Sequence, residues 1–223
     1  MMEIGSREWQ NFIIDGAQQL GIAIDERISA AFATHAAELL HWNRKINLTA
    51  ITDSRDIAIR HFLDSLAPAR FVPDRVRLLD IGSGAGFPGI PLKIFNPSLS
   101  LLLIDGTRKK VNFLKHVIRS LGLDQSEALH IRAENLGHHP ELTSTFDVII
   151  SRALSDLTSF VNTALPLLAK RGKIIGMKGA IDQTELDTLC AEILGERFSL
   201  GIEKYQLPST DSQRSLIIIK NLY

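Results

Sequence analysis

The first third of the chain carries apolar side chains at helical spacing. Three stretches repeat apolar positions every three or four residues, namely 6–21, 25–43 and 53–71. Ser6 is placed to cap the first of these helices, and Pro68 is expected to end the third. The pattern predicts an N-terminal helical extension over residues 1–72 that packs on the rest of the protein.

After Pro73, short apolar runs alternate with amphipathic stretches. The runs that predict strands are 75–82, 99–106, 127–134, 146–153 and 172–179. Because helical patterns separate them, we expect an α/β fold with a mostly parallel sheet and helices on both faces. Two further runs, 198–208 and 214–222, have no helix between them and predict an antiparallel pair near the C-terminus. Residues 73–223 are therefore expected to form the main domain, in one structural unit with the extension.

Composition and charge limit the function classes. Hydrophobic residues make up 45% of the 223 positions, which is enough for a sizeable core. Lys+Arg and Asp+Glu are balanced at 25 each, so any nucleic-acid site must be a local patch. Cys190 is the only cysteine, and the start of the chain resembles no signal peptide. No apolar run approaches the ~20 residues of a membrane helix, so we expect a soluble, cytoplasmic protein.

A glycine-rich loop follows the first predicted strand, in the stretch LLDIGSGAGFPGIPL, residues 78–92. The spacing of its glycines fits two ligand-binding motifs. From Gly84 onward it satisfies G-x-G-x-x-G, and Asp105 follows about 20 residues later, as in dinucleotide-binding proteins. From Asp80 to Gly86 it also fits D-x-G-x-G-x-G. A plain strand–helix turn needs only one or two glycines, so the loop is expected to bind a ligand.

The acid before the glycines favours a ligand without phosphate. A carboxylate at Asp80 would repel a pyrophosphate, whereas it suits a ligand that carries an ammonium and a sulfonium group. S-adenosylmethionine carries both groups. Gly82 and Gly84 would then meet this ligand through bare backbone, and Asp105 would accept hydrogen bonds from its ribose hydroxyls. NAD, in an oxidoreductase, stays as the alternative.

The later strand ends supply further candidates, because the carboxyl ends of parallel strands meet at one edge of the sheet. Ala133 and Glu134 are placed to flank an adenine, although Glu134 is equally placed to be a surface acid. Arg152 is expected to project into the pocket, or to form a structural salt bridge with Asp80 or Asp147. Lys178 would line the rim of the same face.

Six motifs carry a resemblance to a known family. They are WNRKINLTAI (42–51), RHFLDSL (60–66), DIGSGAGFPGIPL (80–92), KKVNFL (109–114), ISRA (150–153) and MKG (177–179). In this order and spacing the chain resembles the bacterial small-subunit ribosomal RNA guanine-N7 methyltransferase G family, also called glucose-inhibited division protein B. One small departure is Gly106, where a serine is common.

The resemblance implies a class I methyltransferase (Rossmann-like) fold, S-adenosylmethionine as the donor, and a guanine of 16S ribosomal RNA, free or in the small subunit, as the acceptor. It places donor contacts at Gly82, Phe87, Ala133, Glu134 and Arg152. We further expect a monomer and no metal site. A non-catalytic RNA- or ribosome-binding protein with a relic pocket is the alternative from another class.

The implied chemistry needs no catalytic acid or base, because guanine N7 carries a free lone pair at neutral pH. The enzyme has to align N7, the methyl carbon and the sulfur. In A-form RNA this edge lies in a deep, narrow groove, so the target is expected in a loop or splayed out. Phe87 would either stack on a base or pack within the loop.

Cationic and polar residues near the pocket are candidates for holding the RNA. They are Arg60, His61 and Lys178, since the family motifs include them. Arg60 has a bland alternative, an ion pair with Asp64 along one helix, and His61 is equally suited to the core. Arg152 is assigned to the donor or to the RNA, because a cation that touches N7 would hinder methylation.

Overall fold

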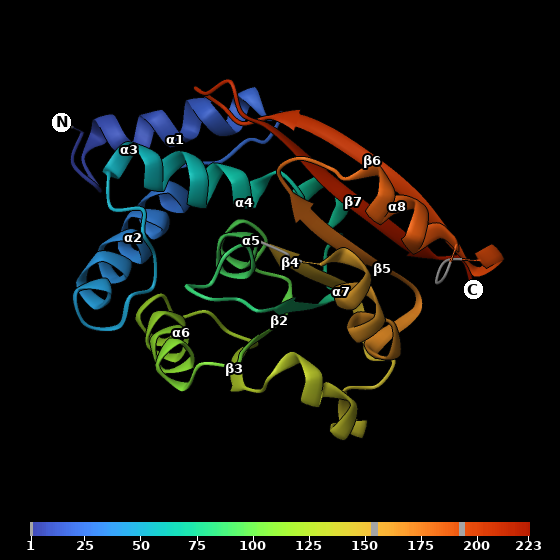
Figure 1. Cartoon of the computed structure of the whole chain (residues 1–223). Helices are drawn as coiled ribbons and strands as arrows, with labels where there is room; N and C mark the ends of the chain where they lie inside the picture. The colour runs from blue at the N-terminus through green and yellow to red at the C-terminus, as the bar shows by residue number, and fades with distance from the viewer. Residues whose placement is uncertain (1, 153–155, 192–194) are drawn as a thin grey trace.

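The computed structural model describes residues 2–152, 156–191 and 195–223. The chain opens with the helices α1 (Arg7–Gln19), α2 (Glu26–Ile46) and α3 (Ser54–Ile57), a π-helical turn (Ala58–Leu63) and α4 (Asp64–Leu66). The side chains of Ser6, Asp25 and Asp53 cap α1, α2 and α3 by accepting hydrogen bonds from backbone N–H groups. The helical extension predicted for this part of the chain is therefore present (Figure 1).

The described residues form a seven-stranded sheet in the order β3-β2-β1-β4-β5-β7-β6. Its parallel strands are β1 (Arg77–Ile81), β2 (Ser100–Asp105), β3 (Ser126–His130), β4 (Phe146–Arg152) and β5 (Leu168–Lys178). The antiparallel strands are β6 (Phe198–Gln206) and β7 (Gln213–Asn221). The later strand of this hairpin, β7, pairs with β5, so the hairpin folds back and β6 becomes the edge. The predicted fold class is confirmed.

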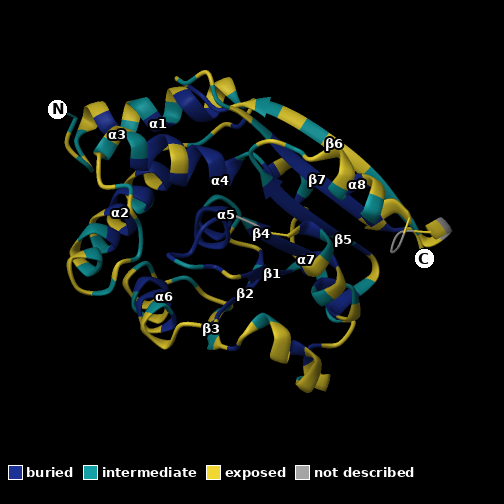
Figure 2. Cartoon of the chain, viewed as in Figure 1, coloured by how far each residue is buried: buried dark blue, intermediate teal, exposed yellow. Residues whose placement is uncertain are grey.

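Successive side chains of the central strands point to opposite faces of the sheet, so the sheet has a hydrophobic core on each face. On β1, Leu78 joins a core with the N-terminal helices, α5 (Gly89–Phe95) and α6 (Arg108–Ser120), whereas Leu79 joins a core with α7 (Leu157–Ala164) and α8 (Gln183–Leu189). Helices therefore cover both faces. Figure 2 shows the central strands buried, whereas the residues of the edge strand β6 are intermediate or exposed. Short 3₁₀ turns connect several elements: Ala69–Phe71, Ala133–His138, Pro140–Leu142, Leu165–Leu167 and Gly195–Arg197.

The N-terminal helices are continuous with the sheet core. Trp9, Phe32 and Phe62 are fully buried and belong to the same hydrophobic cluster as the sheet residues Leu103 and Ile150. The aromatic rings of Phe32 and Phe62 stack at 4.9 Å. Within the described part of the chain, no helix is both long and apolar enough to cross a membrane.

The strand order reverses between β1 and β4, which lie side by side at the centre of the sheet. In open α/β sheets, ligands bind at the carboxyl ends of the strands at such a switch point. The glycine loop after β1 and Arg152 at the end of β4 both lie there. The π-helical turn brings Arg60 and His61 to the same edge, as their contacts with Arg152 show.

Candidate functional site

The glycine loop presents backbone to a cavity. Gly82, Gly84 and Gly86 have φ angles of 71°, 57° and 89°, a region that favours glycine. A Cβ added at Gly82 would meet no atom within 4 Å. The space beside Gly82 is therefore open, and a side chain there would both strain the backbone and project into that space.

Asp80 lies beneath the loop and is fully buried. Its Oδ2 accepts a hydrogen bond from the Gly89 N–H at 2.9 Å, while its Oδ1 has no partner in the structure. A Cβ at Gly89 would lie 2.8 Å from this Oδ2, so only glycine allows the approach. Burial raises the pKa of Asp80 to about 7, although the Gly89 hydrogen bond and the Arg152 charge oppose the shift.

The position of Asp80 bears on the choice between the two ligands. Its carboxylate occupies the first amide of α5, where a dinucleotide-binding fold places the pyrophosphate. A phosphate at this helix end would displace the carboxylate or lie against it. This geometry disfavours NAD and suits a donor that carries positive charge.

Asp105, at the end of β2, is turned onto the loop. Its Oδ2 accepts from the Gly84 N–H at 3.0 Å, and its Oδ1 accepts from the Thr107 N–H at 2.7 Å. The carboxylate therefore fixes the loop shape, and each oxygen keeps a second lone pair. Sequence reasoning anticipated a ribose contact and missed this bracing contact.

A cavity of about 380 Å³ opens beside the loop, and we call it the glycine-loop cavity. Its lining residues are Ile81, Gly82, Ile104, Gly106, Thr107, Ile131, Arg132, Ala133 and Glu134. The structure thus brings together three of the predicted donor residues, Gly82, Ala133 and Glu134. Glu134 is largely exposed and lies 4.0 Å from Arg132.

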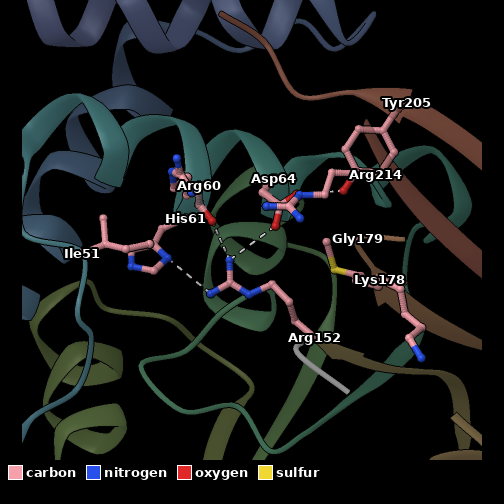
Figure 3. Close-up of a pocket in the computed structure, with 10 residues that line it drawn as sticks. Ile51, Arg60, His61, Asp64, Arg152, Lys178, Gly179, Tyr205 and Arg214 are labelled. Carbon is pink, nitrogen blue, oxygen red and sulfur yellow. Dashed lines mark hydrogen bonds and ion pairs between the residues drawn. The ribbon is translucent and has the colours of Figure 1, made fainter. Parts of the chain in front are cut away.

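A second cavity of about 330 Å³, which we call the arginine pocket, lies at the ends of β4 and β5 (Figure 3). Its lining residues are Ile51, Arg60, His61, Asp64, Arg152, Met177, Lys178, Gly179, Tyr205 and Arg214. The predicted residues Arg60, His61, Arg152 and Lys178 all lie here. Arg152 was expected among the donor residues, but it lines this pocket and not the glycine-loop cavity.

Arg152 is held on three sides. Its Nη1 donates to the carbonyl oxygen of Arg60 at 2.8 Å and lies 3.6 Å from Asp64 Oδ2, and its Nη2 donates to His61 Nδ1 at 3.4 Å. Figure 3 shows these contacts converging on one guanidinium group. Burial lowers the pKa of Arg152, while the charges of Asp64 and Asp80 oppose this shift. The salt bridge predicted to Asp80 or Asp147 is formed with Asp64 instead.

Among the described residues that line the arginine pocket, Asp64 is the only carboxylate, and it is 7% exposed. Its Oδ1 accepts from the Tyr205 hydroxyl at 2.8 Å and lies 3.8 Å from Arg214 Nε. Burial and the charge of Asp64 raise the pKa of Tyr205, so Tyr205 stays a neutral donor. One carboxylate therefore connects helix α4 with strands β4, β6 and β7.

Two predicted RNA residues have partners outside the pocket centre. The alternative pairing of Arg60 with Asp64 is wrong, because Arg60 Nε pairs with Asp56 Oδ1 at 3.2 Å. Asp64 points instead into the pocket. Lys178 forms an ion pair with Glu185 of α8, and its ammonium points away from Arg152 in Figure 3.

The ring of Phe87 has no free face for a base. It is 3% exposed and lies parallel to the rings of His35 and His61. The distances between ring centres are 4.7 Å to His35 and 4.5 Å to His61. Phe87 therefore packs within the loop, the second of the two roles considered. Burial and the Arg152 charge lower the pKa of His61 to about 3, so its ring is neutral and bonded to Thr49 Oγ1 at 3.0 Å.

Sequence reasoning missed Tyr205 and Arg214 of the C-terminal hairpin as residues of the arginine pocket. It also missed the lining residues Ile51, Asp64, Met177 and Gly179. The tail gave only the signal of two strands. An Arg at the start of the apolar run RSLIIIK was the available hint for Arg214. Among the residues described, no group of three or more His, Cys, Asp or Glu side chains is arranged to hold a metal ion.

Comparisons with known proteins bear on this geometry. A family model described as GidB, rRNA small subunit methyltransferase G, matches residues 28–217. The chain is 42% identical to Ribosomal RNA small subunit methyltransferase G of Geobacter metallireducens, with 96% of both chains covered. It is 44% identical to the protein of that name in Geobacter sp. (strain M21), with 92% of this chain and 94% of the relative covered.

The solved structures give the fold. A SAM-dependent methyltransferase from Aquifex aeolicus superposes with a TM-score of 0.58 at 18% identity, and the match covers 78% of this chain and 96% of that one. The glycine loop and both cavities lie within the residues that the family model matches. On the family match and on the identity to its relatives, the chain belongs to the rRNA small subunit methyltransferase G family.

Proposed function

We propose that this protein transfers a methyl group from S-adenosylmethionine to N7 of a guanine in 16S ribosomal RNA. The donor occupies the glycine-loop cavity, and the target nucleotide enters the arginine pocket. The observation that carries the proposal is the loop itself, in which open backbone at Gly82 lies above a buried carboxylate at the first amide of α5. Membership of a ribosomal RNA methyltransferase family supports the choice of acceptor.

The residues present fit such a donor. Gly82 offers a side-chain-free wall, and Ala133 and Glu134 also line the cavity, where they would meet an adenine. Asp80 lies beneath the loop with no protein partner for its Oδ1, and a cationic ligand nearby would favour its charged form. Asp105 keeps lone pairs for the ribose while it braces Gly84. Phe87 contributes by shaping the loop rather than by stacking on a ligand.

When bound, S-adenosylmethionine supplies an electrophilic methyl group on a positively charged sulfur. The protein does not have to remove a proton, because the attacking lone pair of N7 is already free. Alignment of the reacting atoms and exclusion of water are the tasks left to the chain, and such positioning is worth ~7–11 kcal/mol. The neutral His61 fits this scheme, since it is not poised to act as a base at neutral pH.

Charge in the arginine pocket suits the acceptor. The purine becomes cationic as it is methylated, and Asp64 supplies a carboxylate in the pocket wall. Arg152 is turned toward Asp64, the Arg60 carbonyl and His61, which keeps its N–H groups on protein acceptors. Arg60 and Arg214 are partly exposed and are the cations placed to meet RNA phosphates.

The proposal is tested by mapping the methylated position. Small ribosomal subunits from cells that lack the enzyme are incubated with the protein and S-adenosylmethionine that carries a labelled methyl group. The modified nucleotide is then identified by mass spectrometry. We expect label at N7 of one guanine of 16S RNA. Label at another atom or base, or on protein, would refute the assignment, and tight donor binding without transfer would support the non-catalytic alternative.

A further inference from the structure

His35 is a polar residue in an apolar place. It lies on α2, in the N-terminal helical segment, and is fully buried. The ring centres of Phe62 and Phe113 lie 5.5 Å and 6.1 Å from the centre of the His35 ring. Its Nδ1 has no hydrogen-bond partner in the structure. An unpartnered buried nitrogen is costly, so an apolar residue of similar size would pack here at less cost.

The contact that His35 gains is with the glycine loop. Its Nε2 donates to the carbonyl oxygen of Ala85 at 2.9 Å, across fifty residues of sequence. Burial lowers the pKa of His35 to about 4, so the ring is neutral at pH 7 and carries its proton on Nε2. The imidazole therefore forms one directed bond to the backbone between Gly84 and Gly86.

The same ring begins a column of stacked groups. His35 lies parallel to Phe87 with an interplanar angle of 15°, and Phe87 lies parallel to His61 with an angle of 13°. His61 Nδ1 accepts from Arg152, whose guanidinium carbon lies 5.1 Å from the Phe87 ring centre. We call His35, Phe87, His61 and Arg152 the stacked column. It runs from the N-terminal segment through the glycine loop to the arginine pocket.

We propose that His35 is a positioning residue for the methyl transfer, which holds the Ala85–Phe87 part of the loop in the conformation that binds the donor. This inference rests on the proposed function. His35 touches neither cavity, so it acts through Ala85 and Phe87. The N-terminal helical segment is accordingly part of the catalytic unit, because it supplies the hydrogen-bond donor to the Ala85 carbonyl of the loop.

Two substitutions separate the hydrogen bond from the stacking. His35→Phe keeps an aromatic ring beside Phe87 but removes the donor to Ala85. His35→Gln removes the ring but keeps an N–H near the position of Nε2. We expect His35→Phe to raise the Kd for S-adenosylhomocysteine, measured by calorimetry, by about 3–10-fold, as for the loss of one neutral hydrogen bond. We expect His35→Gln to restore affinity to within about threefold of the wild-type value.

A purely structural role predicts a different pattern. Ile13→Val, at a fully buried position of α1, is the matched control for loss of packing in the same core cluster. If His35→Phe weakens donor binding only as much as Ile13→Val does, or if His35→Gln fails to restore it, the inference is overturned. The unfolding temperature of each variant is measured alongside, and that of His35→Phe is expected to stay close to the wild-type value, because removal of the unpartnered Nδ1 offsets the lost hydrogen bond to Ala85.

A readout without donor keeps this test separate from that of the proposed function. Amide hydrogen exchange is followed in the peptide that spans residues 82–90. We expect faster exchange there in His35→Phe than in the wild type, with unchanged exchange in β4 and β5. Unchanged exchange in the loop would overturn the positioning role, whatever nucleotide the enzyme methylates.

Discussion

The glycine-loop cavity and the arginine pocket lie at the same edge of the sheet but are built by opposite means. The first is shaped by main chain, with carboxylates of Asp80 and Asp105 bonded to N–H groups of the loop and its flanks. The second is shaped by side chains, with Asp64 among Arg152, Arg214 and Tyr205. On the proposed function, a donor that never varies would suit a site built on local backbone, whereas an RNA acceptor would need charged groups gathered from distant segments.

The largest effect is expected from a substitution that alters the backbone of the glycine loop. Gly82→Val places a branched side chain at a φ of 71° and into open space beside the cavity. We expect donor affinity, measured by calorimetry, to fall at least ~100-fold, because both strain and occupied volume oppose binding. Gly21→Val is the matched control, since Gly21 has a φ of 73° and equally open surroundings outside both cavities. Equal donor affinity in the two variants would mean that the cavity is misassigned.

The second largest effect is expected from a substitution in the arginine pocket that leaves the glycine loop unchanged. Arg152→Gln removes the cation that Asp64, His61 and the Arg60 carbonyl hold. We expect kcat/KM with small subunits to fall by roughly 30-fold or more, while the Kd of the donor changes by less than about threefold. Arg70→Gln, which removes an exposed arginine paired with Glu203, is the control and is expected to be nearly neutral. A loss of donor affinity that parallels the loss of activity would place Arg152 in the donor site.

A third prediction sharpens the comparison through pH. Folded Asp80 has a pKa of about 7 against 3.8 in a model compound. The folded state therefore holds a proton that the unfolded state has lost between these values, so its contribution to stability is full below pH ~4 and is lost as the pH rises to ~7. This difference in pKa corresponds to roughly 4 kcal/mol in the free energy of unfolding.

Asp80→Asn removes this titration and keeps an acceptor for the Gly89 N–H. The free energy of unfolding of the variant relative to the wild type is expected to rise between pH 4 and pH 8, as measured by urea denaturation. The neutral residues His35 and His61 act in the opposite direction, since their lowered pKa values destabilise the fold as the pH falls below ~6.5. They are present in both proteins and cancel in the difference. If the free energies of unfolding of the two proteins changed in parallel with pH, the raised pKa assigned to Asp80 would be contradicted.

The smallest effect is expected from removal of a hydrogen bond to Asp64 in the arginine pocket. Tyr205→Phe removes the hydroxyl that donates to Asp64 at 2.8 Å. We expect a loss of about 1 kcal/mol in the free energy of unfolding and no change in donor affinity. Tyr223→Phe is the control, because Tyr223 is 69% exposed. An altered donor affinity in Tyr205→Phe alone would show that the two regions are coupled through Asp64.

The contrast also explains what the sequence predicts. The strands, the caps and the glycine loop follow from local patterns, because alternation and turn residues act over a few positions. The bonds of Asp80 to Gly89 and of Asp105 to Gly84 required the folded loop, although both acids were identified. The partner of Arg152 was predicted wrongly, since Asp64 and Asp80 are equally charged and only the folded chain, which brings Asp64 within 3.6 Å of Arg152, selects Asp64. Helical spacing likewise offered Arg60 two carboxylates, and the π-helical turn directs Asp64 away from it.

Residues 153–155 and 192–194 lie outside the described part of the chain, and so does the end of the predicted ISRA motif. Tyr205 and Arg214 reach the pocket because β7 inserts between β5 and β6. This arrangement depends on long-range pairing, which a pattern of two adjacent strands does not specify. The glycine loop was therefore predictable from one segment, whereas the contribution of Tyr205 and Arg214 to the arginine pocket was not.

The most direct test is a crystal structure of the protein with S-adenosylhomocysteine bound. We predict that the ligand lies in the glycine-loop cavity, with its amino acid part over Gly82, its adenine beside Ala133, and its sulfur toward Arg152. A ligand seated in the arginine pocket, or a glycine-loop cavity filled by neighbouring side chains, would contradict this division of the site.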